Sequence, residues 1–307
     1  MPQFSLSRSL SIDAPLETVY TTVRDFKRWP SWSPWLIAEP SCEIDVADDG
    51  DSYSWEGDIV GAGRMEVASE SPHQRIDYRL IFLKPWKSVA AVSFDFQDKD
   101  SAVEVTWTMN GSLPFFMFWM KNTMSALVGM DYQRGLNMLK DFIETGSVPS
   151  KLEFPRTGRF EGSSYLGIQT TCAIADIGER MNQDFKTLVA GLEASGTSPS
   201  GKPITLYHKY DLVKGITKYT AGIPVDHQSV VPIGGTFLGK VESCDTYQIK
   251  HTGPYRHLGN PWSAGMMHER SKVFKQNKKI PPFEVYENDH REVAGNDLKT
   301  TIHFPVA

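Results

Sequence analysis

A single carboxylate, Glu284, is the strongest candidate for chemistry in this sequence. It lies between Phe283 and Val285, and alternation along a strand would place it on the same face as Tyr286. A carboxylate among aromatic side chains is unfavourable unless it is protonated, hydrogen-bonded or met by a cation. This position therefore predicts a counter-charge for a cationic aromatic ligand, with Tyr rings adding cation–π attraction. The alternative is that Glu284 faces solvent on an edge strand.

Other aromatic residues of the second half could form the walls of a pocket around this carboxylate. Each of them could equally pack in the core between a helix and the sheet, and this alternative stays open. The candidates are Tyr255, Trp262, Tyr286, Tyr207 and Tyr219.

The remaining reactive residue types form no recognisable site. The 8 histidines include no HExxH pair, and the 3 cysteines, at positions 42, 172 and 244, are far apart. We therefore expect no metal, no cofactor and no disulfide framework. A P-loop, a dinucleotide-binding glycine motif and a Gly-x-Ser-x-Gly elbow do not occur, so phosphate binding by a loop and triad chemistry have no support.

Length and composition indicate two domains of different character. The chain has 307 residues and a net charge of −5. Residues 1–150 hold 7 of the 8 tryptophans, whereas the rest of the chain holds 7 of the 8 histidines. Residues 1–14 lack the apolar core of a signal peptide, and the longest apolar run, residues 113–120, is shorter than the ~20 residues of a membrane span. We expect a soluble cytoplasmic protein without direct nucleic-acid binding.

The first half has the pattern of an antiparallel sheet with a long terminal helix. Apolar residues alternate with serines over residues 4–12, and Pro15 suits the first turn of a helix. Further alternating segments follow at residues 53–59, 78–82, 90–96 and 103–109. Residues 124–144 contain no proline and predict one long helix that ends at Gly146.

Residues 2–146 resemble the SRPBCC superfamily (START-like and birch-allergen-like), and in particular its polyketide cyclase/dehydrase-like branch. The most specific segment is SIDAPLETVYTTVRDFKRWPSWSPW, which matches the opening of that branch. The resemblance implies a helix-grip fold with an apolar cavity for a hydrophobic molecule. Four aromatic residues on apolar strand faces could line this cavity or fill it: Trp55, Tyr78, Phe94 and Trp107.

The second half is an internal duplication. Residues 203–211 match residues 282–290, which aligns Tyr207 with Tyr286 and Thr205 with Glu284. A helical stripe over residues 174–192 has a counterpart in Leu258, Trp262, Met266, Arg270 and Phe274. Each unit therefore predicts a strand–helix–strand–strand order, and the two units should pair about a pseudo-two-fold axis.

Residues 158–307 resemble the GyrI-like (gyrase-inhibitor-like) domain, the effector-binding domain of multidrug-sensing regulators. The motifs that carry the resemblance are YTAGIPV at residues 219–225, HTGPY at 251–255 and PFEVY at 282–286. The resemblance implies that Glu284 binds cationic ligands. In some relatives this Glu, assisted by Tyr, hydrolyses cyclopropane-bearing compounds. No helix-turn-helix pattern precedes the domain here, which disfavours direct DNA regulation.

The sequence thus predicts an α+β protein with a helix-grip domain at 1–146, a linker at 147–157 and a tandem βαββ GyrI-like domain at 158–307. The expected function is binding of a hydrophobic or cationic aromatic small molecule for sensing, sequestration or resistance. One alternative is a hydrolase with Glu284 as base or nucleophile, assisted by Tyr255 or Tyr286. Another is a gyrase-inhibitor-like module that binds a protein partner.

Overall fold

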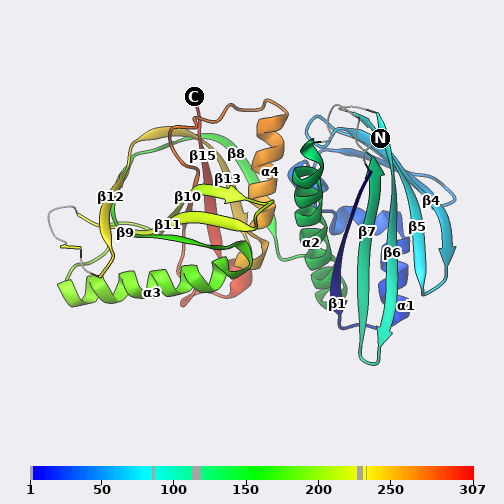
Figure 1. Cartoon of the computed structure of the whole chain (residues 1–307), viewed down its shortest axis with the longest axis horizontal. Coiled ribbons are helices and arrows are strands. Elements are labelled where there is room, and N and C mark those ends of the chain that lie inside the picture. Colours follow the sequence, from blue (N-terminus) through cyan, green and yellow to red (C-terminus); the bar gives the residue numbers. More distant parts are fainter. Residues whose placement is uncertain (1–2, 85–86, 113–118, 227–230, 233) are drawn as a thin grey trace. The chain divides into compact units, whose positions relative to one another are not determined.

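The computed structural model describes residues 3–84, 87–112, 119–226, 231–232 and 234–307. The chain divides into two compact units, Met1–Pro149 and Ser150–Ala307 (Figure 1). This two-domain α+β architecture confirms the predicted fold class.

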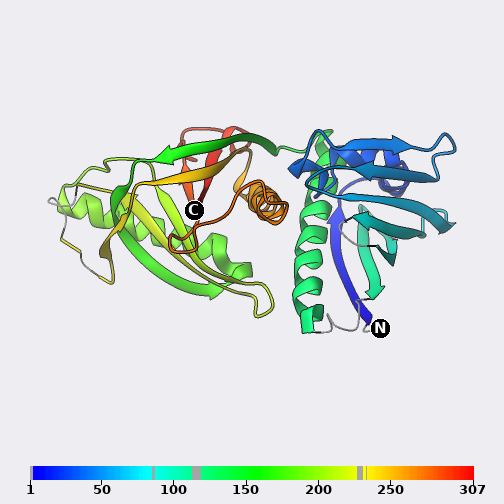
Figure 2. The same cartoon turned by 90° about the horizontal axis from the view of Figure 1, so that it is seen from above.

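The first domain is a seven-stranded antiparallel sheet with the order β1-β7-β6-β5-β4-β3-β2. A long helix, α2, lies against one face of this sheet and contacts β1 (Figures 1 and 2). The elements are β1 (Gln3–Ile12), α1 (Leu16–Arg24), η1 (Phe26–Ser31), η2 (Leu36–Ala38), β2 (Glu43–Val46), β3 (Ser52–Glu56), β4 (Ala62–Ser71), β5 (Arg75–Lys84), β6 (Ser88–Lys99), β7 (Ala102–Ser112) and α2 (Lys121–Thr145).

Local sequence explains where the long helix ends. Gly146 follows α2 in the left-handed conformation, with φ of 82°, and its N–H bonds to the carbonyl of Phe142. A residue with a Cβ would be strained in this conformation, which is why glycine is common directly after a helix.

The second domain is an eight-stranded antiparallel sheet with the order β12-β9-β11-β10-β14-β15-β13-β8. Helix α3 packs on β9 and β11, and helix α4 packs on β13 and β15. The elements are β8 (Lys151–Phe160), β9 (Ser163–Ala173), η4 (Ile174–Asp176), α3 (Ile177–Ser195), β10 (Ile204–Asp211), β11 (Ile216–Pro224), β12 (Phe237–Val241), β13 (Cys244–Thr252), η5 (Tyr255–His257), α4 (Gly259–Arg270), β14 (Phe283–Tyr286), η6 (Gly295–Asp297) and β15 (Lys299–Pro305).

The duplication predicted from the sequence is confirmed, and each repeat has one strand more than expected. The pseudo-two-fold axis passes between β10 and β14, where the two repeats pair. The additional strands are exchanged: β8 precedes the first repeat but pairs with β13, and β12 precedes the second repeat but pairs with β9. Most of the segment predicted to be a linker, residues 147–157, therefore belongs to β8, because pairing with β13 satisfies its backbone.

The helical stripe of the second repeat differs from the prediction. Helix α4 ends at Arg270, so Phe274 lies beyond it, and Met266 is 40% exposed. The buried side of α4 instead includes Ser263, Ala264 and Met267. The 3–4 spacing correctly predicted a helix, but it predicted the wrong side of that helix to be buried. The prediction counted only large apolar residues, whereas small residues of α4 also pack against the sheet.

Candidate functional site

Glu284 lies in the centre of the second sheet and is only 1% exposed. The indole N–H of Trp262 in α4 donates to Glu284 Oε1 at 2.6 Å. The hydroxyl of Tyr286 donates to Glu284 Oε2 at 2.7 Å, and Tyr207 is a third hydrogen-bonding partner. The side chain is therefore buried among aromatic residues, and the alternative of a solvent-facing edge position does not hold.

The carboxylate of Glu284 is held by neutral donors. Burial raises its pKa, and the hydrogen bonds from Trp262, Tyr286 and Tyr207 partly oppose this rise. Burial and the charge of Glu284 also raise the pKa of Tyr207 and of Tyr286 well above the usual value, so both tyrosines stay protonated donors. Within the described part of the chain, no ion pair compensates the charge of Glu284.

A second layer of contacts holds Tyr286. Its hydroxyl lies 3.0 Å from Thr205 Oγ1 and 3.1 Å from the sulfur of Met181 in α3. Since the Tyr286 proton goes to Glu284, Thr205 is the donor in its contact with Tyr286. The edge of Phe185 packs on Tyr286 with 5.7 Å between ring centroids. Tyr286 is thus fixed by side chains from both repeats.

Trp262 reaches Glu284 because α4 lies very close to β15. A Cβ added to Gly265, one turn after Trp262, would come within 2.1 Å of the Phe304 ring. The absence of a side chain at Gly265 therefore allows the close packing of α4 on the sheet. The Trp262 ring meets Phe304 and Tyr207 edge-on, with centroid distances of 5.4 and 4.8 Å.

Tyr255 is the exposed member of the group. It begins η5, is 38% exposed, and packs edge-on against Tyr286 with 5.6 Å between centroids. Burial, followed by the charge of Glu284, raises the pKa of Tyr255 to about 12. Tyr255 therefore lies between solvent and the buried pair of Tyr286 and Glu284.

Tyr219 is not part of the Glu284 site. It pairs in register with Tyr207, but its hydroxyl donates to Asp184 of α3 at 2.8 Å. The sequence also gave no indication of a site role for Met181 and Phe185, which complete the surroundings of Tyr286. The helical spacing of Met181 and Phe185 predicts only that they pack against the sheet. Their contact with Tyr286 could not be predicted, because Tyr286 lies in β14 of the other repeat.

The four aromatic candidates of the first domain lie in one aromatic core. Phe94 stacks on Trp107 at 4.7 Å, and Trp107 stacks on Tyr132 of α2 at 4.0 Å. Tyr78 is 1% exposed and donates its hydroxyl to the carbonyl of Val23 at 3.1 Å. Trp55 is half-buried and packs against this core. Trp107 and Phe94 therefore stack between the sheet and α2, where the resemblance implied a cavity.

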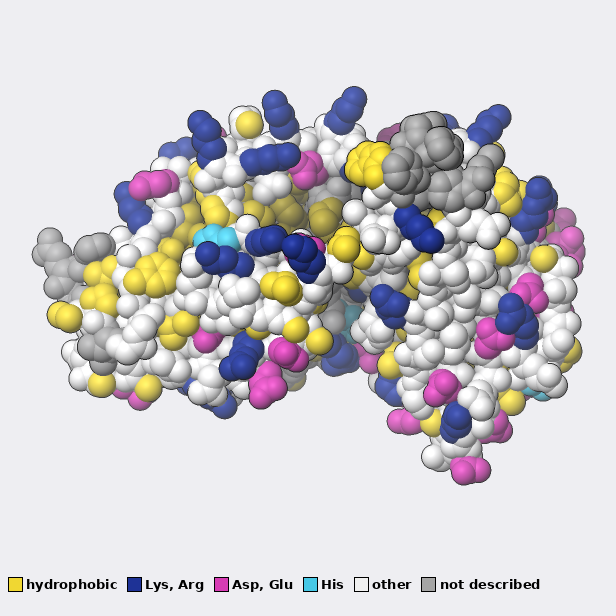
Figure 3. All heavy atoms as spheres, in the orientation of Figure 1, with side chains coloured by type: hydrophobic (Ala, Val, Ile, Leu, Met, Phe, Trp, Pro, Cys, Tyr) yellow, Lys and Arg dark blue, Asp and Glu magenta, His cyan; other side chains and the backbone are white. Residues whose placement is uncertain are grey.

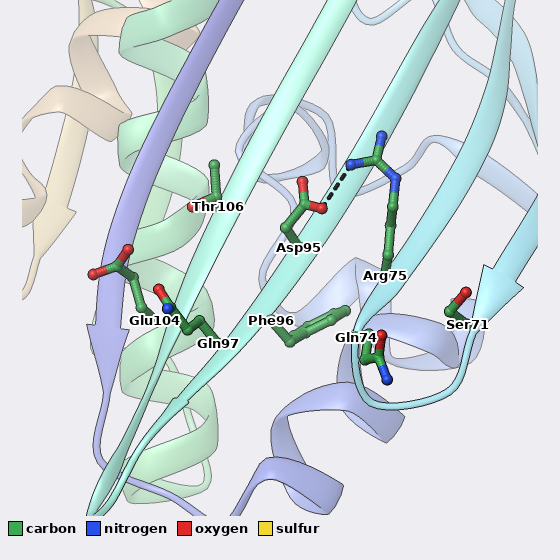
Figure 4. A pocket seen from close by; sticks show the side chains of 8 residues that line it. All are labelled: Ser71, Gln74, Arg75, Asp95, Phe96, Gln97, Glu104 and Thr106. Atoms are coloured by element: carbon green, nitrogen blue, oxygen red, sulfur yellow. Dashed lines mark hydrogen bonds and ion pairs between the residues drawn. The ribbon is translucent and has the colours of Figure 1, made fainter.

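Two surface hollows lie away from Glu284. One, of about 450 Å³, is polar and lies on the first sheet, where Arg75 pairs with Asp95 at 2.6 Å (Figure 4). The other, of about 420 Å³, lies between β9 and α3 and is lined by Asp176, Arg180 and Asp184 among others. Neither hollow contains a residue that the sequence singled out as a candidate.

Three further properties of the described residues bear on possible partners. No cluster of three or more His, Cys, Asp or Glu side chains with the geometry for a metal ion occurs among them. None of the helices in the described ranges is long and apolar enough to cross a membrane. Lysine and arginine side chains are interspersed with aspartate and glutamate side chains on the face drawn in Figure 3.

The first domain matches a known family. Residues 3–144 match the family described as "Polyketide cyclase / dehydrase and lipid transport". This match confirms that the first domain is an SRPBCC domain of the polyketide cyclase type. No curated protein matches the sequence of the chain.

Several solved structures resemble parts of the chain at low identity. CalU16 from Micromonospora echinospora is 16% identical with a TM-score of 0.34, and the match covers 46% of this chain and 74% of CalU16. The Aha1 dimer from Colwellia psychrerythraea is 17% identical with a TM-score of 0.35, over 46% of this chain and 97% of the other. EcmrR, in its DNA complex, is 14% identical with a TM-score of 0.45, over 60% of this chain and 66% of EcmrR.

Proposed function

We propose that the second domain binds a cationic aromatic small molecule, with Glu284 as the counter-charge. The observation that carries this proposal is the buried carboxylate of Glu284, which is enclosed by Trp262, Tyr207 and Tyr286 and has no cationic side chain of the described residues paired with it. Burial of an unpaired carboxylate is unfavourable, and the charge of a bound cationic ligand would offset part of this penalty. The surrounding rings would add cation–π attraction.

The orientation of the donors also fits such a ligand. Trp262, Tyr207 and Tyr286 hold the carboxylate through its oxygens, and their rings surround it. Tyr255 is the exposed ring of the group and packs on Tyr286, so we expect a ligand to enter from solvent past Tyr255. Ligand entry should therefore change the environment of Tyr255 before that of Trp262.

Titration with phenyltrimethylammonium, followed by calorimetry, tests this proposal. Glu284→Gln keeps the shape of the side chain, and the hydroxyl of Tyr286 can accept from the new amide while it donates to Thr205. We expect this variant to bind at least ~10-fold more weakly, which corresponds to about 1.4 kcal/mol. Equal affinities of Glu284→Gln and the unaltered protein would exclude Glu284 as the counter-charge.

Glu287→Gln is the matched control. It removes one negative charge three residues away, but Glu287 pairs with Lys202 and accepts from Thr301 at 2.7 Å. This carboxylate is already paired with a cation, so its loss should leave binding unchanged. A similar loss of affinity in both variants would indicate a general effect of net charge rather than a site at Glu284.

Hydrolysis of a reactive small molecule is the second candidate. The raised pKa of Glu284 and the 2.7 Å contact from Tyr286 are features that a general base and its assisting acid require. Turnover of an electrophilic cyclopropane that is lost in Glu284→Gln would support the enzyme. Binding of the same compound without turnover would support the receptor.

For the first domain we propose binding of a hydrophobic molecule, which its SRPBCC fold supports. The molecule would have to displace part of the stack of Phe94, Trp107 and Tyr132 or occupy space beside it. Native mass spectrometry of the purified chain tests this idea through co-purified ligands. A mass equal to that of the bare polypeptide, with no binding of fatty acids or aromatic polyketides on titration, would count against it.

A further inference from the structure

A row of side chains next to the Glu284 site contains polar atoms that have no hydrogen-bond partner within the described ranges. Thr300 of β15 pairs in register with Tyr286 on one side and with His251 of β13 on the other. Thr300 and His251 are each 1% exposed. Among the described residues, Thr300 Oγ1 and His251 Nδ1 find no hydrogen-bond partner. Such buried orphan atoms are rare in folded proteins and require an explanation.

In the first repeat, the polar groups of the equivalent row have a hydrogen-bond partner. There Tyr219 pairs with Tyr207 on one side and with Thr170 on the other. The hydroxyls of Tyr219 and Thr170 both donate to Asp184 Oδ2, at 2.8 and 2.7 Å. A single carboxylate oxygen from α3 thus satisfies both polar groups of this row. In the second repeat, no side chain of the part that the structure describes supplies such an acceptor to the corresponding groups.

The hydrogen bonds of His251 indicate that its free nitrogen is a donor. Asn260 Nδ2 donates to Ser150 Oγ at 2.9 Å, and Ser150 Oγ lies 3.1 Å from His251 Nε2. Ser150 accepts from Asn260, and we assign its own proton to the hydrogen bond with His251 Nε2, which places the ring proton of His251 on Nδ1. Burial lowers the pKa of His251 to about 4, so the ring is neutral at pH 7. His251 Nδ1 and the Thr300 hydroxyl are therefore two neutral donors.

We propose that Thr300 Oγ1 and His251 Nδ1 form a second subsite, which binds a carboxylate of the ligand whose cationic group meets Glu284. This inference rests on the proposed function and narrows the ligand class to zwitterionic aromatic molecules. The carboxylate would take the place that Asp184 Oδ2 has in the first repeat. Glu284 and Thr300 lie diagonally across β14 and β15, so their Cβ atoms are separated by roughly 7 Å. A benzene ring that carries its two charged groups in para positions spans a similar distance.

Two matched probes test the subsite: phenyltrimethylammonium and 4-(trimethylammonio)benzoate, which differ by one carboxylate. We expect the unaltered protein to bind the benzoate at least ~10-fold more tightly, as charge-assisted hydrogen bonds from two donors would provide. Thr300→Val should abolish this preference and leave the affinity for phenyltrimethylammonium unchanged. Thr170→Val, which alters the equivalent row of the first repeat, should retain the preference.

The outcomes separate the two proposals. Equal affinities for the two probes, or a preference that survives in Thr300→Val, would overturn the subsite while Glu284 keeps its role. If Glu284→Gln leaves the affinity for phenyltrimethylammonium unchanged, or if neither probe binds, the proposed function itself fails.

Thermal unfolding without ligand gives an independent check. Thr300→Val replaces an unsatisfied hydroxyl by a methyl group and should leave the melting temperature unchanged or raise it. Thr170→Val removes a donor to Asp184 and should lower the melting temperature. An equal decrease in both variants would show that the Thr300 hydroxyl has a partner within the protein, and would refute the subsite.

Discussion

Thr205 and Glu284 are direct cross-strand partners in β10 and β14, at the axis that relates the two repeats. They occupy equivalent positions of the duplication, yet one is a neutral hydroxyl and the other a buried carboxylate. Two carboxylates in direct contact could not both ionise. The asymmetry therefore gives the domain one charged site, and Thr205 supports it by donating to Tyr286.

A double-mutant cycle measures this support. Thr205→Val should destabilise the protein by about 1 kcal/mol, because the hydroxyl of Tyr286 loses a buried partner. In the Glu284→Gln background the Tyr286 hydroxyl donates to Thr205 instead of accepting from it, so the same change should have an effect of different size. We expect a coupling energy of at least ~0.5 kcal/mol in urea denaturation. Strictly additive effects would show that Thr205 and Glu284 do not act through one hydrogen-bond chain.

Trp262→Phe should raise the pKa of Glu284 further. The change keeps an aromatic ring but removes the N–H that donates to Glu284 Oε1 at 2.6 Å. Since hydrogen bonds to the charged form lower the pKa of a carboxyl group, their loss favours the protonated form. The affinity for phenyltrimethylammonium, measured against pH, should then reach its plateau at a higher pH than in the unaltered protein. Phe274→Leu, which removes a ring that packs on Phe304 but carries no donor, is the control.

Acid should destabilise the second domain through His251 and His303. Burial lowers the pKa of each to about 4, against an ordinary value of 6.5. The unfolded chain therefore binds more protons between pH 6.5 and 4, and stability falls as the pH decreases through this range. Each histidine contributes a loss of about 2 kcal/mol at pH 5, by the free energy of one pKa unit. The raised pKa of Glu284 acts in the opposite direction, because the folded state then retains its proton as the pH increases above 4.5.

His303→Phe isolates one of these contributions. The ring stacks on Phe283 at 4.7 Å, and phenylalanine would keep this contact while removing the titrating group. The difference in melting temperature of the second domain between pH 7 and pH 5 should become smaller in calorimetry. His290→Phe, at an exposed position, should leave this difference unchanged. An undiminished acid response in His303→Phe would show that His303 does not drive it.

Glu39 fixes a turn of the first domain. Its carboxylate accepts from the backbone N–H groups of Asp58, Ile59 and Val60 at 2.8, 2.9 and 2.9 Å. Glu39→Ala leaves these donors without their charged acceptor and should lower stability by about 1–3 kcal/mol in thermal or urea unfolding. The exposed Glu43→Ala should have little effect. Comparable losses in the two variants would contradict a specific role of Glu39.

The sequence alone determined the two domains, the duplication and the residue on which the candidate site depends. The strands follow from period-two alternation, and the end of the long helix follows from Gly146. The duplication follows from the match between residues 203–211 and 282–290. All of these patterns can be recognised in the amino-acid sequence without knowledge of tertiary contacts. The same alignment showed that Glu284 breaks the symmetry with Thr205.

Only the tertiary structure decided what surrounds that residue. The exchange of β8 and β12 between the repeats, the side of α4 that is buried, and the separation of Tyr219 from the site all depend on contacts between segments distant in sequence. Tyr207 and Tyr219 look equally suitable in the sequence, but Asp184 binds the hydroxyl of one while Glu284 binds that of the other. Hydrogen-bond partners of this kind are set by the packing of helices on the sheet, and the orphan atoms of His251 and Thr300 become visible only when that packing is known.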